Sequence, residues 1–448
     1  MRHGTRERDD TTTVRSVLRL LSKVVPFRDD ELRPMLWATA YGFCIFLAYY
    51  ILRPVRDEIS SADRGNLQII WTAVFLAMLV AVPLYSWIVS RYPRGTFVPL
   101  ANRFFIFNLI VFYAALLLLP EGARAWIDRG FYVWAAVFAL FVPSVFWGFM
   151  ADVFRNDQGK RLFGFIAVGA SLGGIGGSLT TSLLAQTLPP FTLLLFACIP
   201  LEMASWCAGI LHRRYGGKAA MTGVADRPIS GTALSGIRVV FQSPYLMRIA
   251  VYLGLMTFAS TVLYFQQADL IANAFGDDRP ARTAFYANID LAVNIITIFF
   301  QTALVAHLIK KIGVGLSLAI VPTAACLGFV TLGVYPLLAV FVALQVMYRS
   351  GRYGIAKPAR EVLFTVVGRE EKYKSKAFLD AAVYRGGDLV SGWIYAGLAA
   401  VGLSIGAIAL VAAPLAAFWA FVGFDLGQRQ DELSDGKTAA PEEAVAVG

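Results

Sequence analysis

The chain has 448 residues, of which 57% are hydrophobic and 16% are charged, and its formal net charge is +10. Soluble domains are about 45–50% apolar and about 25% charged, so this composition excludes an ordinary soluble protein and indicates an integral membrane protein. Many apolar runs reach about 20 residues, the length of a helix that crosses a bilayer. The alternating pattern of β-barrel strands is absent, so we expect an all-α membrane protein.

The first 33 residues are rich in arginine and contain no early apolar run of the kind found in signal peptides. Within them, residues 12–25 place apolar side chains on one helical face and basic side chains on another. This pattern predicts an interfacial helix that lies on the membrane surface. The alternative is a disordered basic tail.

The apolar runs that follow predict twelve membrane spans. We expect them at residues 34–53, 67–90, 97–119, 131–152, 162–187, 190–211, 246–272, 283–308, 311–332, 335–353, 376–398 and 402–424. With the N-terminus in the cytoplasm, most of the 40 Lys and Arg residues fall in cytoplasmic segments. The positive-inside rule then predicts that both termini are cytoplasmic, in a bacterial inner membrane. The positive charge faces anionic lipid, so no nucleic-acid partner is required.

The order of these spans predicts two pseudo-symmetric six-helix bundles. We expect a cytoplasmic N-terminal segment (1–33), a first bundle (34–211), a cytoplasmic linker (212–245), a second bundle (246–424) and a disordered cytoplasmic tail (425–448). Two such halves are typical of secondary transporters. We expect the protein to be a monomer.

Cysteine and histidine give no sign of a metal site or a disulfide framework. The four cysteines lie within apolar runs, and the three histidines are far apart in the sequence. The chain also lacks the phosphate-binding motif of an ATPase, so we expect no metal and no cofactor.

Charged residues inside the predicted spans are the candidates for function, because each costs about 2.5–3.5 kcal/mol at the centre of a bilayer. Such residues usually face a wet cavity or a partner. We predict that the following bind the substrate: Arg53, Arg56, Arg103, Arg385, Gln266 and Gln267. We predict that the following act in gating or proton coupling: Asp57, Asp152, Asp269, Asp388, Lys160 and Arg161. The alternatives are lipid-facing anchors, topology signals and, for the Arg385–Asp388 pair, a structural ion pair.

The segment YYILRPVRDEIS (49–60) carries four charges at the predicted end of the first span. Arg53 and Arg56 are three residues apart and share a helical face. Pro54 can bend the helix so that this face turns toward a cavity. Asp57 and Glu58 can hold the guanidinium groups when the cavity is empty. The alternative is an ordinary polar cap on the span.

A glycine-rich stretch, GFIAVGASLGGIGGSL (164–179), follows in the fifth span. Gly169, Gly173 and Gly177 recur every four residues and bare one face of the helix for close contact with a neighbouring helix. The contact is either static packing or a surface that slides during transport.

Three segments together resemble one known family. ILRPVRDEI (51–59) resembles the end of the first span in the nucleotide transporter family, the ATP:ADP antiporters of plastids and intracellular bacteria. FWGFMADVFRNDQGKRLFGFIAVGASLGGIGG (146–177) and AKPAREVLFTVVGREEKYKSKAFLDAAVYRGG (356–387) are similar to its fourth-to-fifth and tenth-to-eleventh span junctions. The resemblance implies a major-facilitator-type fold and the exchange of ATP for ADP.

The marker charges of that family are only partly present. Arg56 stands where the family has lysine and Asp152 where it has glutamate, so these charges keep their sign. Ser260 falls where the seventh span has glutamate, and Asp388 falls where the eleventh span has lysine. We therefore expect a secondary transporter of an organic anion, with ATP or ADP as candidates but with weak ATP:ADP exchange. The alternatives are a membrane-embedded enzyme acting on a lipid or nucleotide, and a membrane scaffold or sensor that transports nothing.

Overall fold

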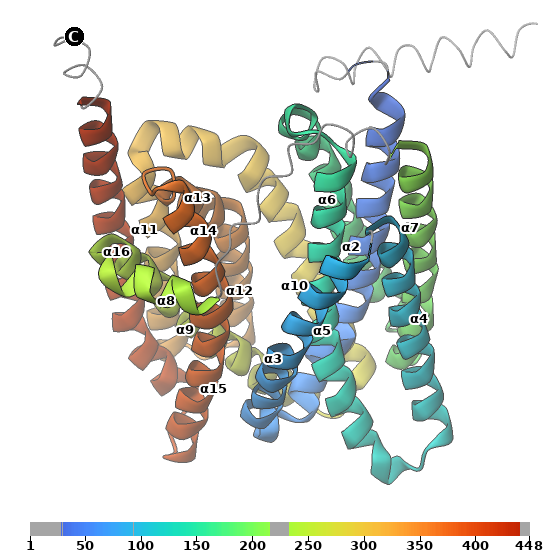
Figure 1. The fold of residues 1–448 in the computed structure, drawn as a ribbon. Helices are drawn as coiled ribbons and strands as arrows, with labels where there is room; N and C mark the ends of the chain where they lie inside the picture. Colours follow the sequence, from blue (N-terminus) through green and yellow to red (C-terminus); the bar gives the residue numbers. More distant parts are fainter. Residues whose placement is uncertain (1–27, 29, 93, 216–232, 440–448) are drawn as a thin grey trace, which may run out of the picture.

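The computed structural model describes residues 28, 30–92, 94–215 and 233–439. Across these residues every regular element is a helix (Figure 1). The interfacial helix predicted for residues 12–25 and the last part of the predicted tail, 440–448, lie outside the described residues.

The first half of the chain contains six long helices at the six predicted spans. They are α2 (Leu32–Ala62), α3 (Leu67–Arg91), α4 (Arg94–Leu118), α5 (Arg124–Val153), α6 (Asn156–Leu184) and α7 (Leu193–Tyr215), with 3-10 turns η1 (Arg64–Asn66), η2 (Glu121–Ala123) and η3 (Pro190–Thr192) between some of them. One boundary differs from the prediction in a way that matters. Helix α2 continues through Pro54 to Ala62, so Arg53 and Arg56 lie inside the helix and not at its end.

The second half repeats the pattern with interruptions. Its helices are α8 (Ala233–Gln242), α9 (Pro244–Phe275), α10 (Arg279–Phe299), α11 (Val305–Val334), α12 (Leu338–Gly351), α13 (Lys357–Leu363), α14 (Arg369–Phe378), α15 (Tyr384–Ala400) and α16 (Ile405–Ala439). Three π-helical segments join some of them: η4 (Phe300–Leu304), η5 (Arg352–Ala356) and η6 (Leu379–Val383). Such segments often mark functional sites, and η5 and η6 both adjoin the cavity described below.

In the described part of the chain, nine helices are long and apolar enough to cross a membrane. One of them, Arg279–Val334, contains both α10 and α11. Two further helical runs, 338–363 and 369–400, are divided by η5 and η6. The merged run counts as one candidate where the prediction has two spans, and the two divided runs are not counted. Nine candidates therefore correspond to the twelve predicted spans.

Helices of the first half lie together on the right of Figure 1 and most of those of the second half on the left, with α10 between them. Helix α2 packs against α6 and α7, and α11 packs against α16. The halves meet where α10 contacts α2 and α6, and where α15 contacts α3. The short helix α8, which the sequence analysis did not predict, packs against α14.

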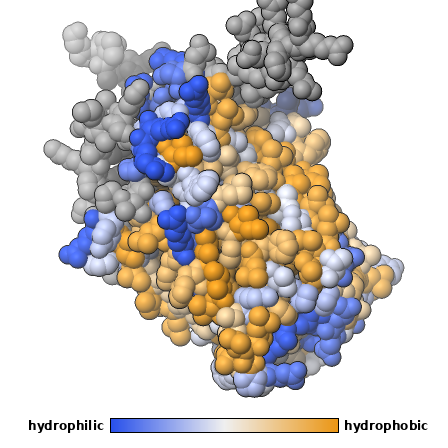
Figure 2. All heavy atoms as spheres, turned by 90° about the vertical axis from the view of Figure 1, so that its right-hand side faces the viewer, coloured by the Kyte–Doolittle hydropathy of each residue, from blue (hydrophilic) through white to orange (hydrophobic). Residues whose placement is uncertain are grey.

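The outer surface carries a broad apolar band between two polar ends (Figure 2). Large apolar side chains of the long helices are exposed, among them Val80 of α3 at 70% and Trp206 of α7 at 69%. Exposed apolar area on this scale is unfavourable in water and matches helices that face lipid.

The last helix, α16, continues to Ala439. The prediction of a disordered tail from residue 425 is therefore wrong as far as Ala439. The helix persists because its apolar face still packs: Leu426 is fully buried, and Arg429 pairs with Asp425 one turn earlier at 3.2 Å.

The glycine face of α6 packs directly on the backbone of α2. A Cβ atom added to Gly173 would lie 2.2 Å from the carbonyl oxygen of Phe43. Added to Gly169 or Gly177, it would lie 2.5 Å from the nearest carbonyl oxygen of α2. Because real Cβ atoms never approach backbone so closely, glycine is what lets these two helices touch.

Candidate functional site

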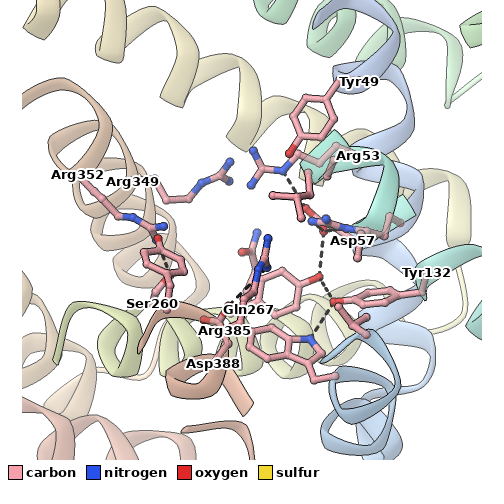
Figure 3. Close-up of a pocket in the computed structure, with 18 of the residues that line it drawn as sticks. Tyr49, Arg53, Asp57, Tyr132, Ser260, Gln267, Arg349, Arg352, Arg385 and Asp388 are labelled. Carbon is pink, nitrogen blue, oxygen red and sulfur yellow. Dashed lines mark hydrogen bonds and ion pairs between the residues drawn. The ribbon is translucent and has the colours of Figure 1, made fainter. Parts of the chain in front are cut away.

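A cavity of about 460 Å³ lies between the two halves of the molecule. Its walls come from α2, α3, α5, α9, α12, η5 and α15. Most of its charged lining is cationic (Figure 3), formed by Arg53, Arg56, Arg349, Arg352 and Arg385 beside Asp57 and Asp388. The cavity thus contains three of the four arginines that the sequence predicted for substrate binding.

In the first half, Asp57 holds Arg53 and Arg56 of α2. Arg56 donates to Oδ1 of Asp57 from Nε at 2.9 Å and from Nη2 at 2.5 Å. Nε of Arg53 lies 3.5 Å from Oδ2 of the same carboxylate. The hydroxyl of Tyr264 in α9 also donates to Asp57, at 2.9 Å, and so ties this cluster to the second half. Asp57 is 3% exposed, so these partners compensate a buried charge.

Asp290 of α10 lies between arginines from the two halves. Arg349 donates to its Oδ1 at 2.6 Å, and Nε of Arg53 lies 3.6 Å from its Oδ2. Figure 3 shows the guanidinium groups of Arg53 and Arg349 pointing toward each other. Arg349 and Arg352 lie within the tenth predicted span, 335–353, but the sequence analysis did not select them as substrate-binding residues. The helical run continues through η5, and both residues line the cavity.

Arg352 is positioned by a hydroxyl and two rings. Its Nη1 donates to Oγ of Ser260 at 2.7 Å, and its guanidinium carbon lies 5.4 Å from the ring centroids of both Tyr353 and Tyr384. These contacts fix the side chain without neutralising its charge.

Arg385 and Asp388 face the cavity from α15, where Nη1 of Arg385 lies 3.8 Å from Oδ2 of Asp388. This is the ion pair that their spacing allowed. Because 3.8 Å is too long for a hydrogen bond, the pair is loose.

An aromatic wall faces the arginines. Nε1 of Trp71 donates to the hydroxyl of Tyr132 at 2.9 Å, and the hydroxyls of Tyr132 and Tyr264 lie 2.8 Å apart. The ring centroids of Trp71 and Tyr264 are 5.3 Å apart, and Arg56 lies over the ring of Tyr132. Arginines beside aromatic rings can bind an anion that also carries an apolar or aromatic part.

Two residues predicted to bind the substrate lie elsewhere. Arg103 of α4 pairs with Glu202 of α7 at 2.8 Å, and its side chain is 57% exposed on the outside of the first half. Gln266 is buried and donates to the carbonyl oxygen of Ile405 at 3.0 Å. Its neighbour Gln267 does line the cavity, because adjacent residues of a helix point about 100° apart.

Most of the predicted gating residues also lie outside the cavity lining. Asp269 accepts a hydrogen bond from Tyr395 at 2.9 Å, near the end of α9. Asp152 lies exposed near the end of α5, and Lys160 is in α6 but its side chain is outside the described part of the chain. Asp57 and Asp388 are the two predicted acids that do line the cavity.

Arg161 joins two helices of the first half at the end where α2 begins. It donates to both carboxylate oxygens of Glu31, at 2.8 and 3.0 Å. Burial by itself raises the pKa of the Glu31 carboxyl, but hydrogen bonds from Arg161, the Arg28 backbone and Gln158 hold that pKa below its ordinary value. This pair links α6 to the start of α2 and does not cross between the halves.

The opposite end, where α2 ends, carries a buried ionic cluster that the sequence analysis missed. Glu58 is fully buried and accepts hydrogen bonds from Arg282 at 2.6 and 3.1 Å and from Arg279 at 2.8 and 3.0 Å. Arg279 also donates to Asp128 of α5 at 2.9 Å. We call these four residues the latch, because they join α2 and α5 of the first half to α10 of the second. Nearby, the hydroxyls of Ser61 and Tyr286 lie 2.7 Å apart across the same junction.

Comparison with known proteins places the chain in context. No family model matches it. It is 23% identical to ADP,ATP carrier protein 2 of Chlamydia pneumoniae, over 93% of this chain and 92% of that protein. Among solved structures, it resembles the nucleoside transporter NupG with a TM-score of 0.64 and 12% identity, covering 88% of this chain and 98% of that one. It resembles the POT family transporter PepTSo with a TM-score of 0.61 and 13% identity, covering 89% and 98%.

These likenesses confirm the predicted fold class and the predicted resemblance. The alternative of a membrane-embedded enzyme is not supported, since the relatives and the structural neighbours are transporters. The chain is a multi-pass membrane protein with a major-facilitator-type fold, and its sequence is distantly similar to the chlamydial ADP,ATP carrier proteins.

Proposed function

We propose that this protein is a secondary transporter that carries an organic anion through the central cavity. The observation that carries the proposal is the convergence of five arginines from both halves on one cavity. The planar guanidinium fork binds carboxylate and phosphate through paired hydrogen bonds and keeps its charge at any physiological pH. Nucleotides are candidate substrates, because the aromatic wall suits a base and because the relatives are named ADP,ATP carriers.

The structure supports specific roles for individual residues in this proposal. We assign substrate contact to Arg53, Arg56, Arg349, Arg352, Arg385 and Gln267, all of which line the cavity. We do not assign substrate contact to Arg103 or Gln266, since neither residue lines the cavity. Asp57 and Asp388 are proposed to neutralise arginines when the substrate is absent.

Transport in this proposal follows alternating access. We propose that the latch closes the end of the molecule where α2 ends and that the substrate enters the cavity from the end where α2 begins. If both termini are cytoplasmic in a bacterial inner membrane, as the basic residues suggest, the latch faces the outside and this conformation is inward-facing. Opening to the outside then requires the ion pairs of Glu58 to break. The access of an external reagent to the cavity tests this orientation.

Flux into sealed vesicles tests the proposal directly. Full-length protein in proteoliposomes should take up at least one of labelled AMP, ADP, ATP or succinate saturably. Uptake should be faster when the vesicles are preloaded with the same anion, if the protein exchanges substrates. Arg53→Gln should reduce uptake by about ten- to a hundredfold, since it removes a charged hydrogen bond to the substrate.

The matched control is Arg103→Gln, which removes an arginine of a neighbouring helix that lies outside the cavity. It should transport like the unmodified protein. If protein-containing vesicles take up none of these anions faster than empty vesicles, the transport proposal fails, and a membrane scaffold or sensor becomes the better description.

A further inference from the structure

The charges around the cavity do not cancel. Five arginines line it, while the carboxylates within reach are the lining residues Asp57 and Asp388 and the adjacent Asp290. The described charged groups of the site therefore leave an excess of two positive charges. A buried site with an uncompensated charge is unfavourable, so a substrate that enters it is expected to supply the opposite charge.

We propose that the substrate is an organic dianion, of the size of a nucleoside monophosphate or a dicarboxylate, whose charged group binds Arg352. This inference rests on the proposed function, because it specifies the anion that the same cavity carries. A volume of about 460 Å³ lies within the usual range of small-molecule sites, about 300–1,000 Å³.

The first excess charge is on Arg352. No carboxylate of a described residue lies within 4.0 Å of its guanidinium group, whereas each of the other four arginines has one. Oγ of Ser260 accepts a hydrogen bond from Arg352 at 2.7 Å, and the rings of Tyr353 and Tyr384 lie beside the guanidinium group. A guanidinium has five donors, so Arg352 keeps enough of them for a two-point contact with a phosphate or carboxylate.

The second excess charge is shared where the two halves meet. Arg53, Arg56 and Arg349 have only Asp57 and Asp290 between them. Nε of Arg53 and Oδ2 of Asp290 are buried without a hydrogen-bond partner, 3.6 Å apart. Buried polar atoms are nearly always hydrogen-bonded in native proteins, so this unsatisfied donor marks a position that a ligand oxygen can fill. One dianion can therefore contact arginines of both halves.

The same reasoning argues against polyphosphates. A ligand with four negative charges would leave about two of them uncompensated inside the cavity, close to Asp57, Asp290 and Asp388. A neutral ligand would leave both positive charges unmatched. The expected order of affinity is thus set by charge, with the dianion first.

Two ligand series that vary charge test the proposal. Binding to the purified full-length protein is measured by thermal shift with adenosine, AMP, ADP and ATP, and separately with succinate and citrate. AMP carries about two negative charges at neutral pH, and each further phosphate adds about one more. We expect AMP to bind more tightly than adenosine, ADP and ATP if the natural anion is a phosphate ester. We expect succinate to bind more tightly than citrate if it is a dicarboxylate.

Two variants change the charge of the cavity in opposite directions and should shift the preferred ligand charge accordingly. Arg352→Gln should weaken binding of the preferred dianion by about ten- to a hundredfold. Asp388→Asn adds one net positive charge and should shift the preference toward ADP or citrate. Asp388→Glu, which keeps the charge, and Arg103→Gln, which lies outside the cavity, should preserve the order seen in the unmodified protein.

The possible failures are distinguishable. If ATP or citrate binds the unmodified protein most tightly and Asp388→Asn leaves that order unchanged, the charge-matching inference is wrong, while anion transport stands. If none of the anions binds, the inference and the proposed function fail together. Should Asp388→Asn not fold, the order of affinities in the unmodified protein decides the question by itself.

Discussion

At the scale of single residues, the site is defined by which arginines have a carboxylate partner. The sequence motif at residues 49–60 pointed to Arg53 and Arg56 as cations that face a cavity, and both line it. Asp57 holds both arginines, as expected, whereas its neighbour Glu58 belongs to the latch and pairs with Arg282. Asp290, like Tyr264, connects this motif to the second half, and it also pairs with Arg349.

Asp290 should therefore be important for stability as well as for the site. Asp290→Asn leaves Arg349 buried, at 9% side-chain exposure, without its carboxylate. We expect the free energy of unfolding to fall by about 3–5 kcal/mol, the usual cost of breaking a buried pair. Arg349→Gln in the same chain should recover part of that loss. Thermal unfolding of the detergent-solubilised protein measures both effects.

The control for this pair is Glu202→Gln, which breaks the exposed contact with Arg103 and should change the free energy of unfolding by less than about 1 kcal/mol. Equal stability of Asp290→Asn and Glu202→Gln would contradict the structural role of the buried pair.

At the scale of elements, the contact between α2 and α6 supports the site, because α2 carries two of its arginines. The glycine face joins two helices of the same half. A contact that slides during transport is expected between halves that move relative to each other, so the packing here favours the static alternative. The approach is so close that the backbone of α2 leaves no room for a methyl group at Gly173.

Gly173→Ala should thus destabilise the protein by about 1–3 kcal/mol, since the two helices must separate to accept the new Cβ atom. Gly164→Ala is the matched control in the same helix, because nothing lies within 4 Å of a Cβ atom at that position. It should be neutral or slightly stabilising, as alanine favours helix. Melting temperatures of the two variants test the difference, and equal values would refute the packing argument.

At the scale of the whole molecule, the latch joins the two halves at the end where α2 ends, which we propose to be the closed end of the cavity. Glu58 connects the first half to two arginines of α10, and no water reaches it in this conformation, since it is fully buried. Removing its charge leaves those arginines without their main partner between the halves. The conformation that is open at the latch end should then be more populated.

A single cysteine at Ala139, which lines the cavity, can report this change in a chain whose four native cysteines are replaced. In intact cells with a permeabilised outer membrane, an impermeant thiol reagent should label it slowly. Glu58→Gln should increase the labelling rate several-fold, whereas Glu202→Gln, on the outside of the first half, should not change it.

This experiment also tests the orientation. Rapid labelling of Ala139→Cys in the presence of an intact Glu58 would mean that the open end faces outward, and the proposed cytoplasmic location of the termini would be wrong. No change on Glu58→Gln, with slow labelling in both chains, would show that the latch does not control access.

The sequence by itself determined the membrane class, the twelve spans, the resemblance and the shared helical face of Arg53 and Arg56, because hydropathy and short motifs are local properties of the chain. Only the tertiary structure decided which charges meet. Asp57 and Tyr264, or Glu58 and Arg282, are more than 200 residues apart, so no local pattern pairs them. Likewise, Gln266 and Gln267 are neighbours in the sequence, but helix rotation turns Gln266 toward Ile405 and Gln267 toward the cavity. Arg349 and Arg352 lie within a predicted span, but only the tertiary structure, in which the helical run continues through a π-helical segment, shows that both line the cavity.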